Sequence, residues 1–322
     1  MKFNSKSHTI TRLVLEFSLV IACLTQTDSR AATALLFPSA DTSLLEVSPS
    51  NNLGGFIGMN SGTTQNFPRT RALMKFDLTI FPTNTLIQSG VLTLQVTQQP
   101  IDGYALTLFG LHRMFRPWGE GNKRPTSQPG QGLPASAGEA TWVHAFFPTN
   151  LWTISGGAAG IDFSPNQSSF QTVYDAASSP YIFPETPEMT DDLKLWVGRP
   201  TTNFGWMLLC AEEQTIFTAR RFGTREDVNN HPVLELHYLV PPVLQITKTN
   251  ATQVAIRFTA WAGHTYNIQY RNSLKLGSWL PLKTIAASPT NYTAVVLDFA
   301  QADNRFARYR SYRQRFYRAS AQ

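Results

Sequence analysis

The feature that most constrains this chain is a succession of short runs in which apolar residues alternate with polar ones or stand together. Alternation with a period of two places successive side chains on opposite faces of a β-strand. Breaks rich in Gly, Pro, Ser and Asn separate the runs, as turns separate strands. The sequence therefore predicts an all-β protein of the sandwich type. Between Leu35 and Tyr238 the predicted strands cover residues 71–78, 91–97, 106–111, 206–210, 217–222 and 233–239.

The run over residues 71–78 shows the alternation most clearly. A period of two gives this strand one apolar face, which we expect to line the core. That face carries Ala72, Met74, Phe76 and Leu78. The opposite face, which we expect to point away from the core, carries Arg71, Leu73, Lys75 and Asp77.

Composition favours the same fold class. Charged residues make up 15% of the chain, against about 25% in an average globular protein, and Thr, Ser, Asn, Gly and Pro are abundant. Strands joined by tight turns use such residues, whereas helix surfaces carry many charges. We expect one short helix over residues 189–197, capped by Thr190 or Asp191 and ended by Gly198.

The length of 322 residues suits two domains and a processed leader. Pro241 and Pro242 cannot continue a strand ladder, so they mark the boundary and predict a proline hinge. We expect residues 35–240 to form a large, jelly-roll-like β-sandwich, with the irregular stretches 116–141 and 156–181 at one end or rim. Residues 243–322 predict a small fibronectin-III-like β-sandwich of five to seven strands, from runs at 253–259, 265–270, 279–284, 293–299 and 315–319.

Residues 1–34 are predicted to be a signal peptide, because Lys2, Lys6 and Arg12 precede an apolar stretch at 13–24. That stretch is shorter than the ~20 residues that cross a bilayer, so no transmembrane span is expected. Two small-x-small cleavage sites compete.

The two competing cleavage sites are Ala32-Thr33-Ala34 and Ser29-Arg30-Ala31. A third interpretation is a lipoprotein signal, since residues 20–23 resemble a lipobox and would make Cys23 a lipidated N-terminus. Every version predicts export, to the extracellular space or the cell envelope.

Cysteine and charge divide the chain further. Only Cys210 remains after removal of the signal, within an apolar run, so we expect a buried thiol and no disulfide. Residues 35–242 carry a net charge of −5 and residues 243–322 carry +9, within a total of +6. The basic character therefore belongs to the second domain.

Four segments, in order, resemble the bacterial DNRLRE-domain proteins, a β-sandwich family that overlaps an alginate-binding carbohydrate-binding module group. The resemblance covers residues 38–239 and rests on these groups: Asp41-Thr42 with Asn52-Leu53-Gly54; residues 71–78; Trp118-Gly119-Glu120 with Ala140-Thr141-Trp142 and Trp152; and Arg221-Phe222-Gly223-Thr224-Arg225-Glu226 with residues 232–236. Thr224 stands where the family usually has Ser, and the insertion between Trp118 and Trp142 is long. The second domain resembles a C-terminal module of planctomycete and verrucomicrobial secreted proteins.

The family resemblance implies a non-catalytic protein that binds polysaccharide, including anionic glycans of the alginate type. Flat aromatic rings stack on sugars, which makes Trp118, Trp142 and Trp152 candidate ligand-binding residues; the alternative is that they are core anchors. A binding site for carboxylated sugars needs cationic side chains to pair with the carboxylates. The candidates are Arg71, Lys75, Arg221 and Arg225, with ordinary pairing to Asp77 or Glu226 as the alternative.

No enzyme class gathers support from the sequence. The histidines are scattered without zinc spacing, and no nucleophile-elbow motif is present. The least implausible activity is a polysaccharide lyase, which would use His237 beside Tyr238 with a cation such as Arg221. We therefore expect no catalysis, with an envelope structural or adhesion protein and a lyase as the alternatives.

Two further partners come from charge. A structural calcium ion is a candidate cofactor, because carboxylates lie near strand ends of the first domain, at Asp41, Glu46, Asp227 and Glu235. The tract from Arg305 to Arg318 is rich in arginine with aromatic residues between. Export argues against nucleic acid there, so the remaining alternatives are acidic envelope components or a solvated strand face.

Overall fold

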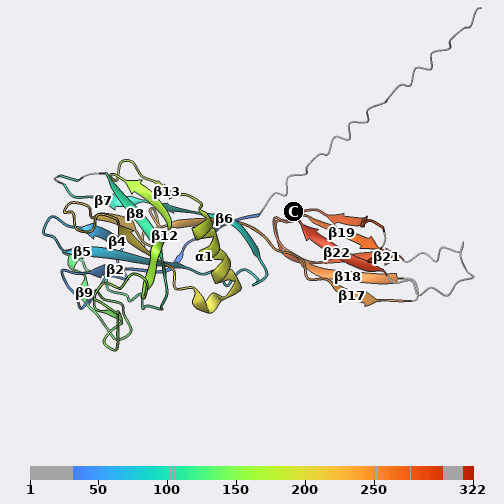
Figure 1. Cartoon of the computed structure of the whole chain (residues 1–322), viewed down its shortest axis with the longest axis horizontal. Helices are drawn as coiled ribbons and strands as arrows, with labels where there is room; N and C mark the ends of the chain where they lie inside the picture. Colours follow the sequence, from blue (N-terminus) through green and yellow to red (C-terminus); the bar gives the residue numbers. More distant parts are fainter. Residues whose placement is uncertain (1–31, 102, 105, 251–252, 276, 300–314) are drawn as a thin grey trace, which may run out of the picture.

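A computed structural model describes residues 32–101, 103–104, 106–250, 253–275, 277–299 and 315–322. The predicted signal peptide up to Ala31, Cys23 and most of the tract from Arg305 to Arg318 lie outside the described residues. The all-β prediction is confirmed: two β-sandwich domains follow one another along the chain (Figure 1). In the described part of the chain, no helix is long and apolar enough to cross a membrane.

The first domain is a sandwich of two antiparallel sheets. The smaller sheet contains, in order, β1 (Ala32–Leu36), β16 (Val233–Leu239), β6 (Leu86–Leu94) and β13 (Tyr181–Phe183). The larger sheet contains β12 (Phe163–Val173), β8 (Thr107–Met114), β14 (Trp206–Cys210), β5 (Arg69–Phe76), β4 (Gly58–Thr63), β15 (Arg220–Gly223) and β7 (Val96–Gln98), with β2 (Pro38–Leu45) paired to β5.

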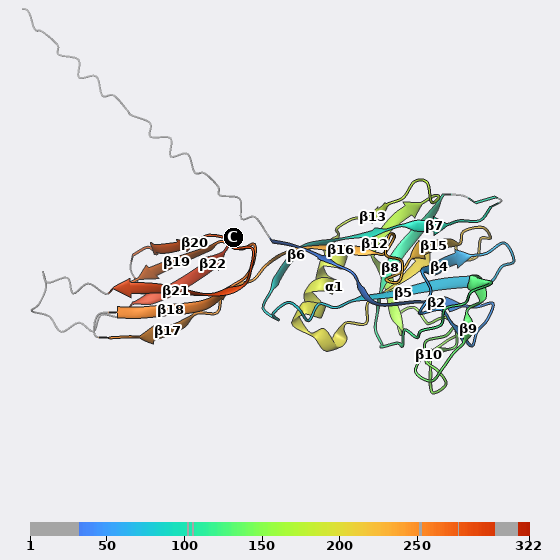
Figure 2. The same ribbon diagram turned by 180° about the vertical axis from the view of Figure 1, so that it is seen from behind.

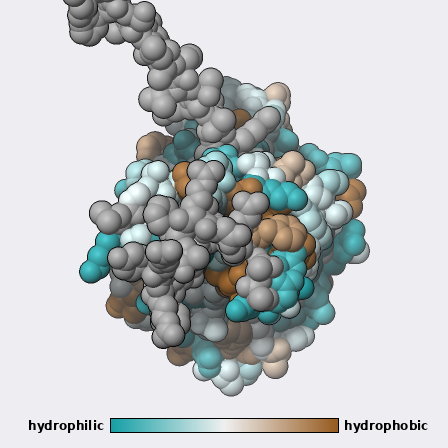
Figure 3. Space-filling model, turned by 90° about the vertical axis from the view of Figure 1, so that its right-hand side faces the viewer, coloured by the Kyte–Doolittle hydropathy of each residue, from teal (hydrophilic) through white to brown (hydrophobic). Residues whose placement is uncertain are grey.

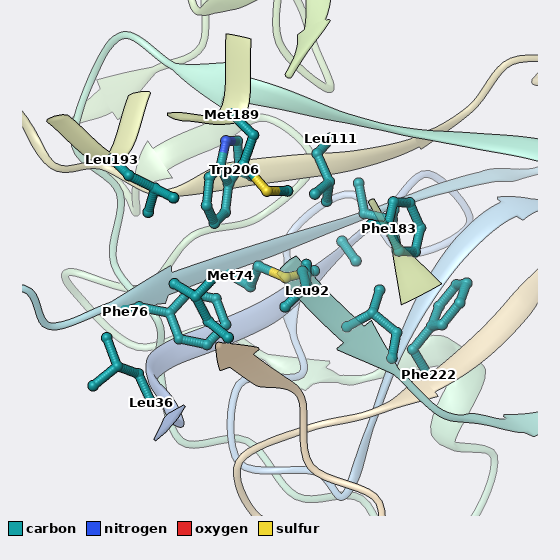
Figure 4. Packing of buried hydrophobic residues seen from close by; sticks show 14 of the residues in the cluster. Leu36, Met74, Phe76, Leu92, Leu111, Phe183, Met189, Leu193, Trp206 and Phe222 are labelled. Atoms are coloured by element: carbon teal, nitrogen blue, oxygen red, sulfur yellow. The ribbon is translucent and has the colours of Figure 1, made fainter. Parts of the chain in front are cut away.

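The main core lies between these two sheets. The apolar face predicted for β5 is confirmed, since its side chains belong to this core: Ala72, Met74 and Phe76, with Leu78 just beyond the strand. The helix α1 (Pro187–Gly198) adds Met189 and Leu193, which lie beside the indole of Trp206 (Figure 4). Gly90 on β6 permits this approach, because a Cβ there would lie 2.4 Å from Leu193 Cδ1.

The helix begins earlier than the sequence predicts. Its N-cap is Thr186, whose hydroxyl accepts a hydrogen bond from the Met189 amide at 3.0 Å, and not Thr190 or Asp191. Pro187 at the first helical position fixes a helical φ and lacks the N–H that would be unpaired there. Gly198 ends the helix, as expected.

A second core lies on the outer face of the larger sheet. Residues 116–162, here called the covering segment, pass over that face and include the short strands β9 (Leu133–Pro134), β10 (His144–Phe146) and β11 (Asn150–Leu151). Leu73, Met207 and Leu209 of the sheet pack against them. Two expectations are therefore wrong: Leu73 is fully buried, and the stretch 116–141 covers a face of the sandwich and does not only form its rim.

Cys210 at the end of β14 is buried, as the apolar run around it predicts. Burial disfavours the thiolate and raises the pKa of the thiol to about 11. The group is therefore a weak nucleophile at neutral pH.

The second domain is a smaller sandwich of two three-stranded antiparallel sheets. One contains β17 (Gln245–Lys248), β18 (Gln253–Ala260) and β21 (Tyr292–Phe299); the other contains β20 (Leu280–Ile285), β19 (Tyr266–Arg271) and β22 (Phe316–Ala321). Ile256, Phe258, Tyr266 and Ile268 lie in its own core. Seen from this end of the molecule, the coloured part of the surface has both hydrophilic areas and apolar patches (Figure 3).

The two domains meet at Val240, the residue that follows β16. Its amide donates to His264 Nε2 at 3.0 Å and its carbonyl accepts from the Tyr266 hydroxyl at 3.3 Å. Asn84 of the first domain donates to the Pro241 carbonyl at 3.1 Å. The proline boundary is thus a hydrogen-bonded joint between the sandwiches, which lie end to end (Figure 2).

The first strand begins at Ala32, three residues before the predicted domain start at Leu35. Ala32, Thr33 and Ala34 pair in register with Tyr238, His237 and Leu236 of β16. These three residues are therefore part of the smaller sheet.

Candidate functional site

The three candidate tryptophans lie in the second core. Trp118, Trp142 and Trp152 are 8%, 4% and 3% exposed. Trp118 Nε1 donates to the Phe204 carbonyl at 2.8 Å, and Trp152 Nε1 donates to the Thr141 carbonyl at 2.9 Å. The three rings are buried between the covering segment and the sheet. They are therefore not exposed for stacking on a sugar ring.

Arg71 is likewise occupied within the fold. Its Nε and Nη2 donate to both carboxylate oxygens of Glu213 at 2.8 and 2.7 Å. Its Nη1 donates to the carbonyls of Gly156 and Gly157 at 2.8 and 3.1 Å. The side chain is only 11% exposed, so Arg71 holds the covering segment and Glu213 onto β5. Lys75, two residues further along β5, is partly exposed.

Arg225 lies in the turn after β15, beside three carboxylates. Its guanidinium forms two hydrogen bonds to Glu120, at 2.6 and 3.1 Å, and lies 3.0 Å from Glu226. Its backbone amide donates to Asp41 Oδ2 at 2.9 Å. The basic strip predicted from Arg71, Lys75, Arg221 and Arg225 is not formed, because β4 separates β5 from β15 and Arg71 and Arg225 are paired with acids.

This carboxylate cluster brings together residues that are far apart in the sequence. Asp41 is fully buried, and Asp41 Oδ1 and Glu226 Oε2 are buried without a hydrogen-bond partner. Burial raises the pKa of Asp41 well above its usual range and also raises the pKa of Glu226. The cluster therefore favours the protonated form of at least one acid.

The calcium candidates are dispersed. Glu46 pairs with Arg69 at 2.6 Å, Asp227 accepts from neighbouring amides, and Glu235 lies on β16 beside His237. Only Asp41 joins other carboxylates. Among the described residues, no group of three or more His, Cys, Asp or Glu is arranged to hold a metal ion, and the calcium expectation stays a prediction.

His237 does not lie beside Arg221. It is on β16 of the smaller sheet, where Nδ1 lies 3.2 Å from the Thr33 hydroxyl and Nε2 lies 3.2 Å from Glu235. Arg221 is on β15 of the larger sheet. Tyr238 packs edge-on against Phe81, next to the domain joint. The base and cation expected for a lyase are therefore not assembled.

Arg221 is the candidate residue that faces an open groove. The groove has a volume of about 350 Å³ and is lined by residues of β4, β5, β7 and β15. Figures 1 and 2 show β4 and β7 at the end of the first domain away from the second. The groove wall combines apolar surface with side chains that carry amide, hydroxyl and guanidinium groups: Asn60, Thr64, Gln65, Asn66, Thr70, Gln98, Gln99, Gln131 and Arg221.

Strand pairing explains how this wall is built. Arg221 is opposite Asn60 on β4 and Gln98 on β7, so both amides lie next to its side chain. Arg221 Nε donates to Asn60 Oδ1 at 3.2 Å, and Nη1 donates to Gln98 Oε1. The guanidinium carbon also lies 5.4 Å from the centre of the Phe56 ring. No described carboxylate forms an ion pair with Arg221, so its charge is not neutralised.

The amides are the site residues that the sequence did not reveal. Asn60 and Gln98 come from different strands, and single amides in polar stretches carry no distinctive spacing. The carboxylate cluster had a weak signal, because Asp41, Glu120, Arg225 and Glu226 all occur in the quoted family motifs.

The described part of the arginine tract is small. Arg315 pairs with Asp298 at 2.7 Å and lies over the Tyr270 ring at 4.3 Å. Arg318 is exposed on β22.

The fold and the groove together define a two-domain, all-β protein with an amide-lined, cationic groove at its free end. The chain matches no family model, and no curated protein matches its sequence.

Proposed function

We propose that this chain is an exported, non-catalytic polysaccharide-binding protein and that the groove at Arg221 is its binding site. The observation that carries the proposal is the amide and guanidinium wall of that groove. Amide groups both donate and accept hydrogen bonds, which matches the hydroxyl groups of sugars. Binding sites for small ligands are concave, and a few polar groups at defined positions fix the orientation of the ligand.

The pre-organisation of Arg221 strengthens this proposal. Asn60 and Gln98 hold its guanidinium without neutralising it, so less side-chain freedom is lost when a ligand binds. A guanidinium matches a carboxylate through two parallel hydrogen bonds and also donates to hydroxyls. The groove therefore suits uronate-containing glycans. Neutral glycans also remain candidates, because the domain as a whole carries a net charge of −5, which disfavours a strongly anionic ligand.

The ordered resemblance to DNRLRE-domain proteins supports the same function. Its last motif includes Arg221, which lines the groove. The predicted leader, upstream of a strand that begins at Ala32, supports export. An envelope protein that uses the sandwich only as a scaffold is the competing class, because a sandwich fold alone does not define function.

The test is binding of the full exported chain to a panel of polysaccharides that includes alginate, polygalacturonate and neutral β-glucans, by affinity electrophoresis and calorimetry. Arg221→Gln removes the charge and is expected to weaken binding by about tenfold, the effect of one charge-assisted hydrogen bond. Gln65→Ala changes an exposed wall residue and is expected to weaken binding without affecting folding.

Arg199→Gln is the matched control, because Arg199 is an exposed arginine at the end of α1, away from the groove. It should bind as the unmodified protein does. Equal loss in Arg221→Gln and Arg199→Gln would place the site elsewhere. Absence of binding to every polysaccharide would favour the scaffold class, and a rise in ultraviolet absorbance from unsaturated uronate would favour the lyase.

A further inference from the structure

The second domain carries much more positive than negative charge. Residues 243–322 contain eleven Lys and Arg residues and two Asp residues. Asp298 is the carboxylate side chain of this domain that the structure describes, and it is used internally. It accepts from Arg315 at 2.9 and 2.7 Å and from the Tyr317 hydroxyl at 2.8 Å. Neither Lys283 nor Arg318 forms an ion pair with another described residue of this domain, whereas Arg315 does, with Asp298.

Arg271 and Arg318 converge on one aromatic ring. The guanidinium carbon of Arg318 lies 4.5 Å from the centre of the Trp279 ring, and that of Arg271 lies 5.4 Å from it. The strand pairing explains this: the outward side chains of β19 and β22 lie next to each other, with Gln269 opposite Arg318. We call Arg271, Trp279, Lys283 and Arg318 the cationic face.

The two guanidiniums are also held by hydrogen bonds. Arg318 Nε donates to Gln269 Oε1 at 2.7 Å. Arg271 donates to the Ser273 carbonyl and, at 3.2 Å, to the Gly277 carbonyl. The contact between Arg318 and Gln269 does not neutralise the charge of Arg318, because an amide oxygen carries only a partial charge. Cations fixed in this way lose little side-chain entropy when an anion binds.

A shallow hollow of about 340 Å³ lies beside Arg318 and Lys283. No Asp or Glu side chain lines it. Several of its lining residues carry amide or hydroxyl groups: Asn267, Gln269, Thr284, Ser320 and Gln322. The hollow thus combines two cations with groups that pair with sugar hydroxyls.

We propose that the cationic face is a second binding site, specific for acidic polysaccharide that carries sulfate or carboxylate groups. Guanidinium and ammonium groups supply the attraction to the anions. The amides and hydroxyls of the hollow favour a sugar chain over a lipid headgroup, which would leave most of them unused. This site is on a different domain from the Arg221 groove and does not depend on it.

The experiment measures binding of the full exported chain to dextran sulfate and polygalacturonate, with uncharged dextran and vesicles of phosphatidylcholine and phosphatidylglycerol as comparisons. With the groove weakened by Arg221→Gln, the further double change Lys283→Gln/Arg318→Gln should reduce binding to the two acidic polymers about tenfold, since each exposed ionic contact contributes a few-fold. Trp279→Phe should retain most of the binding because a ring remains.

The control double variant is Lys248→Gln/Arg257→Gln, which removes the same charge from β17 and β18 of the opposite sheet. It should lose less than about twofold. Both double variants are compared in the Arg221→Gln background, which separates loss of binding at this site from loss of binding at the groove.

Three results would overturn the proposal. Equal losses in the two double variants would show attraction by net charge alone. Tighter binding to the anionic vesicles than to both polymers would make the face a membrane surface. Equal binding to uncharged dextran would show that the site does not recognise the anionic groups of the polymer.

Discussion

Three arginines of the first domain show how neighbours decide what one residue type does. Arg71 is paired with the carboxylate of Glu213. Arg220 is 1% exposed and donates to carbonyls, among them that of Tyr174 at 2.6 Å. The next residue is Arg221, whose guanidinium donates to two side-chain amides and lies near one aromatic ring in the described part of the chain. The sequence cannot separate these roles, because they depend on which strands become neighbours.

At the same scale, Asp41 gives the stability of the protein an unusual pH dependence. Its pKa is raised by burial, so the folded state holds a proton that the unfolded chain releases near pH 4. The stabilisation is complete below that pH and is lost as the pH rises through the folded pKa. Asp41→Asn keeps the shape of the protonated acid. It should gain stability relative to the unmodified protein by up to about 1.4 kcal/mol per pH unit across that window.

Urea unfolding at several pH values between 4 and 8 measures this difference. Asp77→Asn is a control of opposite sign, because hydrogen bonds from Thr79 lower the pKa of Asp77. That carboxylate stabilises the fold above pH 4, and its contribution is lost on acidification. If Asp41→Asn is destabilised by the same amount at every pH, Asp41 is charged in the folded protein and the inference is wrong.

At the scale of elements, the sequence predicted strands and the core face of β5 well. Period-two alternation reports one apolar face, and Ala72, Met74 and Phe76 are buried as predicted. It does not report that the opposite face is also covered, and Leu73 looked solvent-exposed for that reason. The cover comes from residues 116–162, an irregular stretch whose tryptophans are spread too widely to show a period.

The start of β1 predicts the site of signal cleavage. Cleavage after Ala34 would remove three residues that pair with β16, whereas cleavage after Ala31 leaves the strand intact. If the proposed leader is removed, we expect the mature chain to begin at Ala32. N-terminal sequencing and intact mass of the protein from a bacterial host test this. A chain that begins at Leu35, or one that carries a lipid on Cys23, would contradict it.

At the scale of the whole molecule, the domain joint is a structural unit. His264 is buried, its Nδ1 lies 2.9 Å from the Ala262 carbonyl, and its Nε2 accepts from Val240. These partners require the proton on Nδ1. The two proline residues alone suggested a hinge, because nothing in the sequence showed that His264 and Tyr266 would reach back to Val240.

Replacing that histidine should loosen the joint. His264→Ala leaves the Val240 amide buried without a partner, at a cost of about 1–3 kcal/mol. We expect faster proteolysis near Pro241 and a broader distribution of molecular dimensions in small-angle scattering. His231→Ala, which changes a histidine in contact with Phe37 at a distance from the joint, is the control. Unchanged scattering for His264→Ala would mean that the joint does not depend on this bond.

The burial of Cys210 has a practical consequence for all of these measurements. Its thiol is 3% exposed and has a pKa of about 11, so maleimide dyes should not label the folded domain. Cysteines introduced at positions outside the two sites, as in Arg199→Cys of the first domain and Lys248→Cys of the second, would then be the positions that accept a fluorophore. Energy transfer between the two dyes would report, in single molecules, whether one glycan chain engages both ends of the protein at once.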